Sequence, residues 1–255
     1  MLFLTEQDVK DALKGDDAYK EAVALIERVL AQQSAGTTHH LKRTTMTHPQ
    51  HPGHLWHNIR MLPGMAPDLG AAAVRLYSGY RGTNRSEIIC LFDWDDMRMS
   101  AIISDAYLHA IRTAAPYGVA AKYLARKGAR TLGIIGSGRY ARGMAQAVCA
   151  VCPIETIQVY SRNPDNVRSF CDEMRAALGI EVVACASGRD AMRSVDIMIT
   201  ATSGNQIVFE ADWLTPGTSF AEAAAALLDK GARAVLQTGG AEGATAHSRH
   251  APISA

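Results

Sequence analysis

The sequence lacks any long apolar run. Hydrophobic residues make up 48% of the 255 residues, yet runs such as Ala223 to Leu228 are far shorter than the roughly 18 residues that suggest a membrane span. The first residues, MLFLTEQDVKDALKGDD, have no basic segment ahead of an apolar one and turn acidic at once, which argues against a signal peptide. These absences predict a cytoplasmic protein without a membrane partner.

A strong net charge is also missing. Lys and Arg number 26 against 25 Asp and Glu, so the formal net charge is +1, and no long run carries one sign. Proteins that bind nucleic acid or anionic lipid electrostatically concentrate basic residues. The charge balance therefore gives no reason to expect nucleic acid as a partner.

Cysteine is scarce, and the five residues are an odd number. In a chain without export signals this favours reduced thiols over a disulfide framework. Cys149 and Cys152 form a C-x-x-C pair, but a redox pair requires a helix N-terminus to lower its pKa. Here the pair ends the stretch RGMAQAVCAVC, whose spacing suits a helix packed on a sheet. We interpret the pair as buried structural thiols.

The pattern along the chain changes near Leu124. Before it, two predicted helices (about 5–13, opened by Thr5 and Asp8, and 18–32) precede short β-like segments at 41–46, 55–61, 72–77, 87–94 and 98–104. A long amphipathic pattern follows over 105–126, and we expect Pro116 to bend or interrupt it. Beyond it, apolar strands at 131–135, 156–160, 181–185 and 196–201 alternate with helices, which is typical of a parallel sheet.

The stretch TLGIIGSGRYARG, residues 131–143, has the spacing of a dinucleotide-binding turn. Gly136 makes the tight turn, Gly138 lets the backbone approach a pyrophosphate, and Ala141 lets the helix sit close to the strand. A lone G-x-G-x-x-A motif is weak, but this one lies between a strand and a helix with a second strand beyond. We predict a nucleotide site rather than a simple glycine turn, formed by Gly136, Ser137, Gly138, Arg139, Tyr140 and Ala141.

The predicted fold class is α/β. A Rossmann-type parallel sheet domain that binds NAD(P) covers residues 116–220, and an N-terminal α+β domain covers residues 1–115. Residues 221–255 form an atypical tail, rich in Ala and Gly with little strand pattern.

The end of the second parallel strand bears on the choice of cofactor. A cofactor without a 2′-phosphate is usually held there by Asp or Glu, whereas this chain has Ser161, Arg162 and Asn163. A hydroxyl and a guanidinium suit a phosphate, so we predict NADP, with NAD possible. The alternative is that Asn163 only caps the next helix and that Arg162 is solvated.

Four histidines recur at every third residue in HPQHPGHLWH: His48, His51, His54 and His57. An extended path set by the intervening prolines puts all four on one face. They therefore form either a metal site or a loop that borders a substrate pocket. No Asp, Glu or Cys accompanies them, and the spacing fits no structural zinc pattern, so we predict no metal.

The run HAIRTAAPYGVAAKYLARKGARTLGIIGSG, followed by VYSRNP, VDIMITATSG and WLTPGT, resembles the ornithine cyclodeaminase/mu-crystallin family. The resemblance covers about residues 41–218. It implies a homodimer in which the N-terminal domain binds substrate and dimerises. Members of this family, which includes alanine dehydrogenases and ketimine reductases, transfer a hydride between NAD(P) and the α-carbon of a small amino or imino acid.

The resemblance also implies roles for individual residues. Arg112 matches the arginine that binds the substrate carboxylate, and Thr113 matches a cofactor contact. Arg43 matches an N-terminal arginine of the same pocket. Thr202 and Ser203 stand where the family reaches the nicotinamide. A guanidinium that grips a carboxylate through two hydrogen bonds would fix the α-carbon for the hydride.

Two features depart from the family pattern. Arg75 stands where the family usually has a lysine, and because arginine keeps its proton, we expect Arg75 to bind a second carboxylate or the surroundings of the imine. After Phe220 the expected acidic turn is missing, and we interpret the tail as a shifted reading frame or a truncation, with Glu222 a weak substitute for the acid. No catalytic residue is assigned from the sequence.

The preferred function is therefore an NAD(P)-dependent imine reductase or amino acid dehydrogenase. An ornithine cyclodeaminase-type lyase that recycles NAD is the first alternative, disfavoured by Arg75 and by the missing acid. A non-catalytic, mu-crystallin-like NADP-binding protein is the second.

Overall fold

The structure is a computed structural model that describes residues 1–13, 17–50, 58–79, 87–202, 208–210 and 213, and the strands 219–220, 234–238, 244–248 and 252–253. The chain divides into an N-terminal unit, Met1–Gly15 and Arg28–His109, and a C-terminal unit, Asp16–Glu27 and Ala110–Ala255. The predicted boundary after residue 115 lies inside helix α3 (Ala106–Leu124), which has residues in both units.

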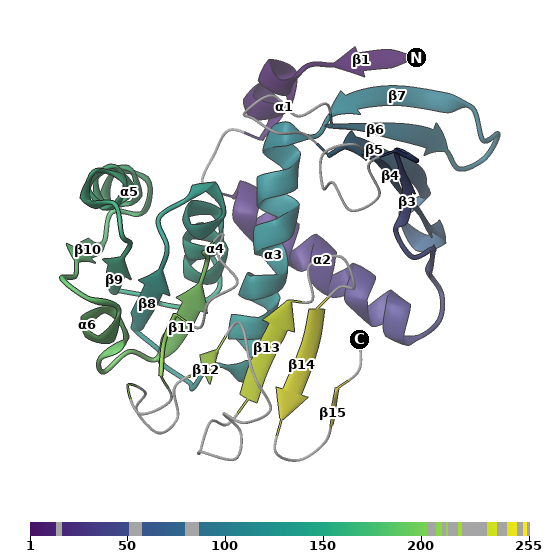
Figure 1. Cartoon of the computed structure of the whole chain (residues 1–255). Coiled ribbons are helices and arrows are strands. Elements are labelled where there is room, and N and C mark those ends of the chain that lie inside the picture. Colours follow the sequence, from purple (N-terminus) through teal and green to yellow (C-terminus); the bar gives the residue numbers. More distant parts are fainter. Residues whose placement is uncertain are drawn as a thin grey trace. The chain divides into compact units, whose positions relative to one another are not determined.

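A mixed sheet forms the N-terminal unit, in the order β1-β7-β6-β5-β4-β2, with β3 also paired to β4 (Figure 1). Its pairs are antiparallel, apart from β1, which runs parallel to β7. The sequence does not predict β1 and β2, because three and two residues show no alternation. The strands are β1 (Leu2–Leu4), β2 (His39–His40), β3 (Thr44–Thr47), β4 (Asn58–Ala66), β5 (Ala71–Ser78), β6 (Glu87–Asp93) and β7 (Met99–Ser104), with the 3₁₀ turn η1 (Pro67–Leu69) between β4 and β5.

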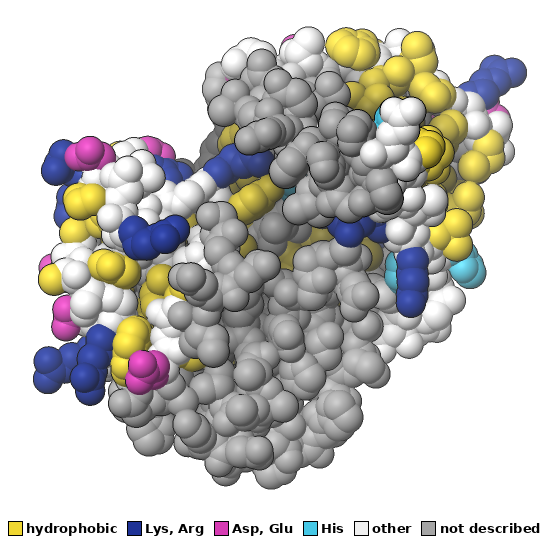
Figure 2. All heavy atoms as spheres, in the orientation of Figure 1, with side chains coloured by type: hydrophobic (Ala, Val, Ile, Leu, Met, Phe, Trp, Pro, Cys, Tyr) yellow, Lys and Arg dark blue, Asp and Glu magenta, His cyan; other side chains and the backbone are white. Residues whose placement is uncertain are grey.

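One face of this sheet is apolar and partly exposed. The cross-strand register brings five exposed apolar side chains to it: Phe3, Met46, Ile59, Met65 and Met99. Figure 2 shows hydrophobic side chains gathered over this unit. We call this surface the apolar face. Because side chains alternate along a strand, the residues between these positions point to the opposite face.

The helices begin largely as predicted. Helix α1 (Glu6–Ala12) starts at Thr5, whose Oγ1 accepts from the Asp8 backbone N at 3.2 Å, while the Thr5 N donates to Asp8 Oδ2 at 2.8 Å. This reciprocal pair is a capping box. Helix α2 spans Ala18–Ser34. Helix α3 continues through Pro116, which removes one helix hydrogen bond to the Arg112 carbonyl without ending the helix.

The C-terminal unit is built on a second sheet, in the order β10-β9-β8-β11-β12-β13-β14-β15. All neighbours from β10 to β13 are parallel. In chain order this section is 3-2-1-4-5-6, the Rossmann order, and a ligand crevice opens where the order reverses beside β8. The strands are β8 (Thr131–Ile135), β9 (Thr156–Tyr160), β10 (Glu181–Ala184), β11 (Ile197–Thr200), β12 (Ser219–Phe220) and β13 (Ala234–Thr238).

The predicted α/β fold is therefore confirmed, but the last strands differ from the prediction. The sequence predicts little strand structure after residue 220, whereas β13, β14 (Ala244–Ser248) and β15 (Pro252–Ile253) continue the sheet, the last two pairs being antiparallel. Pairing at a sheet edge is made by backbone groups, so it needs no strong side-chain alternation.

Two hydrophobic clusters cover the faces of this sheet. The larger contains Leu132 and Ile134 of β8 and residues of α2, α3, α4 (Arg139–Cys149) and α5 (Pro164–Leu178). The smaller contains Ile135 and residues of α6 (Gly188–Met192). Since Ile134 and Ile135 point to opposite faces, the clusters lie on opposite sides of β8. This packing fixes the carboxyl ends of β8 and β9.

Asp196 ties the start of β8 to β11. Its Oδ2 accepts from the backbone N of Arg130 at 2.7 Å and of Thr131 at 3.0 Å. Burial raises the pKa of this carboxyl, but these hydrogen bonds and the Arg126 and Thr131 side chains outweigh burial and lower it. The charged carboxylate is therefore a structural group rather than a proton carrier.

Cys149 and Cys152 are free and partly buried at the end of α4. Burial raises the pKa of the Cys149 thiol to about 12, with a smaller contribution from Cys152. Both observations agree with structural thiols. In the described part of the chain no helix combines the length and the apolar character that a membrane crossing needs.

Candidate active site

The loop between β8 and α4 has the backbone of a phosphate site. Gly136 has φ +117°, a backbone conformation that residues other than glycine rarely adopt. A Cβ at this position would meet the Ala201 carbonyl. Gly138 is the N-cap of α4, and no side chain caps that end. Among the described residues, a Cβ on Gly138 would meet nothing within 4 Å. No described side chain therefore occupies the space in front of the helix N–H groups beside Gly138, which fits a pyrophosphate.

Arg142 stabilises this loop through hydrogen bonds, a role that the motif alone does not predict. It donates to the Ser137 carbonyl, and its Nε and Nη2 donate to the two Glu173 oxygens at 2.6 and 2.9 Å. This bidentate bond is the main reason why the pKa of Glu173 is lowered. The buried Ser137 is thereby tied to α5. At the first turn of α4, Arg139 Nη2 donates to the Tyr140 hydroxyl at 3.2 Å.

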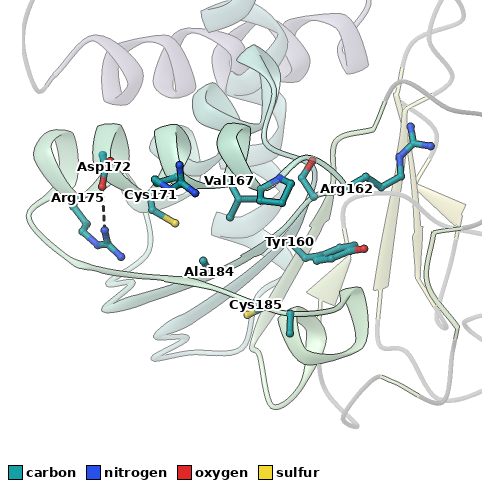
Figure 3. Close-up of a pocket in the computed structure, with 12 residues that line it drawn as sticks. Tyr160, Arg162, Val167, Cys171, Asp172, Arg175, Ala184 and Cys185 are labelled. Carbon is teal, nitrogen blue, oxygen red and sulfur yellow. Dashed lines mark hydrogen bonds and ion pairs between the residues drawn. The ribbon is translucent and has the colours of Figure 1, made fainter.

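A cavity of about 550 Å³ lies at the ends of β9 and β10 against α5. Figure 3 shows Val167 and Cys171 projecting from α5 toward the strand ends, and Arg162 extending away from α5. This volume is in the range of small-molecule sites. The lining residues are Tyr160, Ser161, Arg162, Pro164, Val167, Arg168, Cys171, Asp172, Arg175, Ala184, Cys185 and Ala186.

Three arginines and one carboxylate line this cavity. Arg175 pairs with Asp172 at 3.3 Å, and Arg168 pairs with Asp165 at 3.0 Å. Arg162 is exposed, and within the described part of the chain no ion pair or hydrogen bond engages its guanidinium. The cavity therefore presents a free cation next to Ser161, where the ribose of a bound dinucleotide would lie.

Asn163 is the N-cap of α5, as the alternative interpretation expects. Its side-chain oxygen accepts from the backbone N of Asp165 at 2.9 Å and of Asn166 at 3.3 Å. Its contact with a cofactor stays a prediction, as do those of Ser161 and Arg162.

Other predicted cofactor and substrate residues also lie in the C-terminal unit. Arg112 and Thr113 are partly buried on α3, and the buried Thr113 Oγ1 has no hydrogen-bond partner among the described residues. Thr202 is exposed just after β11. Ser203 lies outside the described residues.

A row of polar side chains crosses the N-terminal sheet on the face opposite the apolar one. Arg60 lies opposite Tyr77, and Tyr77 lies opposite Glu87. Asp105 follows β7, and its backbone N donates to the Glu87 carbonyl at 3.0 Å. We call Arg60, Tyr77, Glu87 and Asp105 the polar row. Arg75, two residues before Tyr77, points to the same face.

Arg75 is buried within this row. Its Nε donates to Asp105 Oδ2, and its Nη2 donates to Glu87 Oε2 at 2.7 Å. His109 Nδ1 lies 2.8 Å from the same Glu87 oxygen and 3.0 Å from Arg75 Nη2. Both carboxylates are buried as well. Arg75 therefore neutralises protein carboxylates here, and its predicted contact with substrate stays a prediction.

Arg43, Arg60 and Arg75 converge on Tyr77. Arg43 Nη1 lies 3.3 Å from the Tyr77 hydroxyl oxygen. The guanidinium carbons of Arg75 and Arg60 lie 4.0 and 5.5 Å from the centre of its ring. Burial raises the pKa of this phenol, but the hydrogen bonds and charges of Arg43 and Arg60 outweigh burial and lower it.

The geometry does not favour a metal ion at Glu87, Asp105 and His109, and it describes one of the four clustered histidines. Glu87, Asp105 and His109 have ligand atoms within 4.8 Å of one another, but the Arg75 cation already bonds to both carboxylates. His48 is exposed, and its Nδ1 accepts from the Gln50 backbone N at 3.2 Å. His51, His54 and His57 lie outside the described residues.

Sequence reasoning missed Arg60, Tyr77, Glu87, Asp105 and His109. One signal was present: Arg75 and Tyr77 are two residues apart on one predicted strand and so share a face. The partners on other strands depend on register, which the sequence does not give.

Comparisons with known proteins identify the family of this chain. The sequence matches the model of the ornithine cyclodeaminase/mu-crystallin family over residues 2–233. It is 37% identical over 122 residues to a Delta(1)-pyrroline-2-carboxylate reductase of Bacillus cereus, covering 48% of this chain and 38% of that protein. It is 35% identical over 112 residues to an ornithine cyclodeaminase of Agrobacterium fabrum, covering 43% of this chain and 31% of that protein.

A solved structure is similar over more of the chain. It is the Delta(1)-pyrroline-2-carboxylate reductase of Thermococcus litoralis in complex with NADH and L-proline, with a TM-score of 0.75 and 34% identity, covering 86% of this chain and 68% of that one. The matches to the two curated relatives span less than half of the length of either. With the family model covering most of its length, the chain belongs to the ornithine cyclodeaminase/mu-crystallin family.

Proposed function

We propose that the protein is an NAD(P)-dependent oxidoreductase that reduces a small imine bearing a carboxylate, by hydride transfer at the α-carbon. The observation that carries this proposal is the Rossmann strand order with an uncapped α4 N-terminus beside Gly138. Similarity to a reductase solved with NADH and L-proline supports the substrate class.

In this proposal, separate groups of residues bind the cofactor and the substrate. The loop from Gly136 to Ala141 holds the pyrophosphate, and Ser161 and Arg162 hold the ribose end. Thr113 contacts the cofactor, and Thr202 and Ser203 contact it on its nicotinamide side. Arg112 and Arg43 bind the substrate carboxylate. The reduced nicotinamide supplies the hydride, while the arginines fix the α-carbon by gripping the carboxylate.

A cyclodeaminase-type activity is less well supported. Arg75 keeps its proton, and its Nε and Nη2 are bonded to Asp105 and Glu87. It therefore suits charge neutralisation better than the proton transfer that a lysine would provide at this position.

We also propose a homodimer formed through the apolar face, and a cytoplasmic location. Phe3, Met46 and Ile59 on that face are each about half exposed or more, at 69, 56 and 49%, and large exposed apolar patches mark association surfaces. The free cysteines fit a reducing compartment.

The first test of the function is the reduction of a five-membered cyclic imine that carries a carboxylate next to the C=N carbon. The wild-type protein should oxidise NADPH or NADH with this imine and much less with the same ring without the carboxylate. Arg112→Lys keeps the charge but loses the planar fork, so turnover should fall about 10-fold or more while cofactor affinity changes little. Rates are followed by cofactor absorbance, and affinity by cofactor fluorescence.

Other outcomes of this test support other functions. Ammonia release from ornithine without net cofactor oxidation would identify a cyclodeaminase. Cofactor binding without either reaction would identify a non-catalytic binding protein.

Cofactor preference is tested separately with Arg162→Ala. We propose NADP as the preferred cofactor, because Arg162, beside Ser161, has no ion pair with the described residues, and no carboxylate is at the strand end. The variant should lose about 1–3 kcal/mol of NADPH affinity, as expected for a charge-assisted hydrogen bond, and much less of NADH affinity. Arg193→Ala, an exposed arginine outside the cavity, is the matched control. Equal losses for both cofactors would contradict the assignment.

A further inference from the structure

Most donors of the Arg142 guanidinium are already bonded within the C-terminal unit. Its Nη1 donates to the Ser137 carbonyl, and its Nε and Nη2 donate to the two Glu173 oxygens at 2.6 and 2.9 Å. Nη2 also donates to the Ser169 hydroxyl oxygen at 3.0 Å. The guanidinium carbon lies 5.6 Å from the centre of the buried Phe170 ring. Because a guanidinium has five N–H donors, little of Arg142 is left for direct contact with a cofactor.

The bond to the Ser137 carbonyl also fixes the next N–H group of the loop. A trans peptide is planar, so its C=O and N–H point in opposite directions, and the described residues contain no cis peptide. With the Ser137 carbonyl directed at Arg142, the N–H of Gly138 points away from Arg142. Ser137 is buried and Gly138 is exposed. No hydrogen bond to a described residue engages the Gly138 N–H.

We infer that Arg142 is a positioning residue for the cofactor pyrophosphate. It holds the peptide between Ser137 and Gly138 in the orientation that presents the Gly138 N–H, and the first N–H groups of α4 behind it, to the phosphates. This role rests on the cofactor site of the proposed function. A loop that is held in its binding conformation before the cofactor arrives loses less conformational freedom on binding, and this raises affinity.

Glu173 keeps the Arg142 side chain in place. Its two oxygens accept from two nitrogens of one guanidinium, which is the geometry of the stronger charge-assisted bonds. The hydrogen bond from Arg142 is also the main reason why the pKa of Glu173 is lowered. The carboxylate is therefore charged at neutral pH and holds the guanidinium against α5.

The test variant is Arg142→Met, which keeps an apolar stem beside Phe170 and removes the guanidinium. The affinities for NADPH and NADH should both fall, by about 10-fold, the equivalent of roughly one hydrogen bond to a charged group. The two losses should be equal, because both cofactors carry the same pyrophosphate. Cofactor fluorescence measures both affinities. A loss restricted to NADPH would place the effect at the 2′-phosphate and overturn the inference.

Arg126→Met is the matched control for a purely structural role. Arg126 Nε donates to Asp196 Oδ1 at 2.5 Å, at the opposite end of β8 from the loop. Its removal should lower the free energy of unfolding and leave both cofactor affinities close to wild type. If Arg142→Met also lowers only the stability, measured by denaturant unfolding without cofactor, Arg142 does not position the pyrophosphate site.

A double variant tests whether Arg142 acts through the loop. Gly138→Ala places a methyl beside the same N–H groups, so in that background Arg142→Met should cost clearly less affinity than in the wild type. Equal losses in the two backgrounds would show that Arg142 acts independently of the loop, which contradicts the inference.

Cofactor binding and turnover are measured separately, so the outcomes distinguish this inference from the proposed function. If the wild-type protein binds neither NADPH nor NADH, both are wrong. If it binds a cofactor but reduces no imine, the proposed reductase function is wrong, and the affinities of the Arg142 variants still decide the role of Arg142.

Discussion

Replacing Arg75 by leucine is expected to lower the free energy of unfolding by about 3–5 kcal/mol, one of the largest effects of any single change in this chain. Glu87 and Asp105 are 4 and 0% exposed, and Arg75 is the cation bonded to both. Leucine fills part of the space of the Arg75 side chain but leaves both buried carboxylates without their cation. Denaturant unfolding, followed by circular dichroism, measures the loss.

Arg75→Lys is the matched control for this experiment. Lysine keeps the charge but cannot bond to both carboxylates through a planar fork, so the loss should be clearly smaller than for leucine. The difference between wild type and Arg75→Leu should also shrink at acid pH, because protonated carboxylates no longer need a cation. A leucine variant as stable as the wild type would show that the cluster does not stabilise the fold.

Gly136→Ala is expected to damage both the fold and the cofactor site. A residue with φ +117° costs roughly 1–3 kcal/mol when it carries a side chain, and the new methyl would meet the Ala201 carbonyl of the neighbouring strand end. Overpacking adds roughly 1–3 kcal/mol. Unfolding by denaturant and titration of NADPH by fluorescence together measure the two effects.

Gly138→Ala separates these effects. Its backbone, at φ −80° and ψ −177°, is ordinary for alanine, and no atom of the described residues lies within 4 Å of the added methyl. Stability should therefore stay close to wild type, while NADPH affinity falls because the methyl occupies the space beside the α4 N-terminus. If Gly138→Ala binds NADPH normally, the pyrophosphate does not lie at this helix end.

The C-terminal sheet shows how much local sequence predicts. Strands β8 and β9 have the predicted bounds, because apolar runs between Gly and Asn are strong signals on their own. The capping box at Thr5 and the turn at Gly136 are also local, since each depends on residues within a few positions. The pairing of β13 to β15 was missed, because short strands at a sheet edge are fixed by their backbone partners.

The candidate site divides in the same way. The loop from Gly136 to Ala141 and the proposed ribose-binding residues after β9 follow from a motif and its distance along the chain. Arg60, Glu87 and Asp105 do not, because they reach Tyr77 and Arg75 only through the register of β4, β5, β6 and β7. A shift of one residue in any of these pairs would turn a side chain to the apolar face.

The sequence by itself determined the α/β class, the dinucleotide turn and the family, because periodicity and motif spacing are properties of neighbouring residues. Only the tertiary structure decided that Arg75 neutralises Glu87 and Asp105, and that Arg43 donates to Tyr77. A charge acts through distance in space, and these residues come from strands that only the folded sheet aligns.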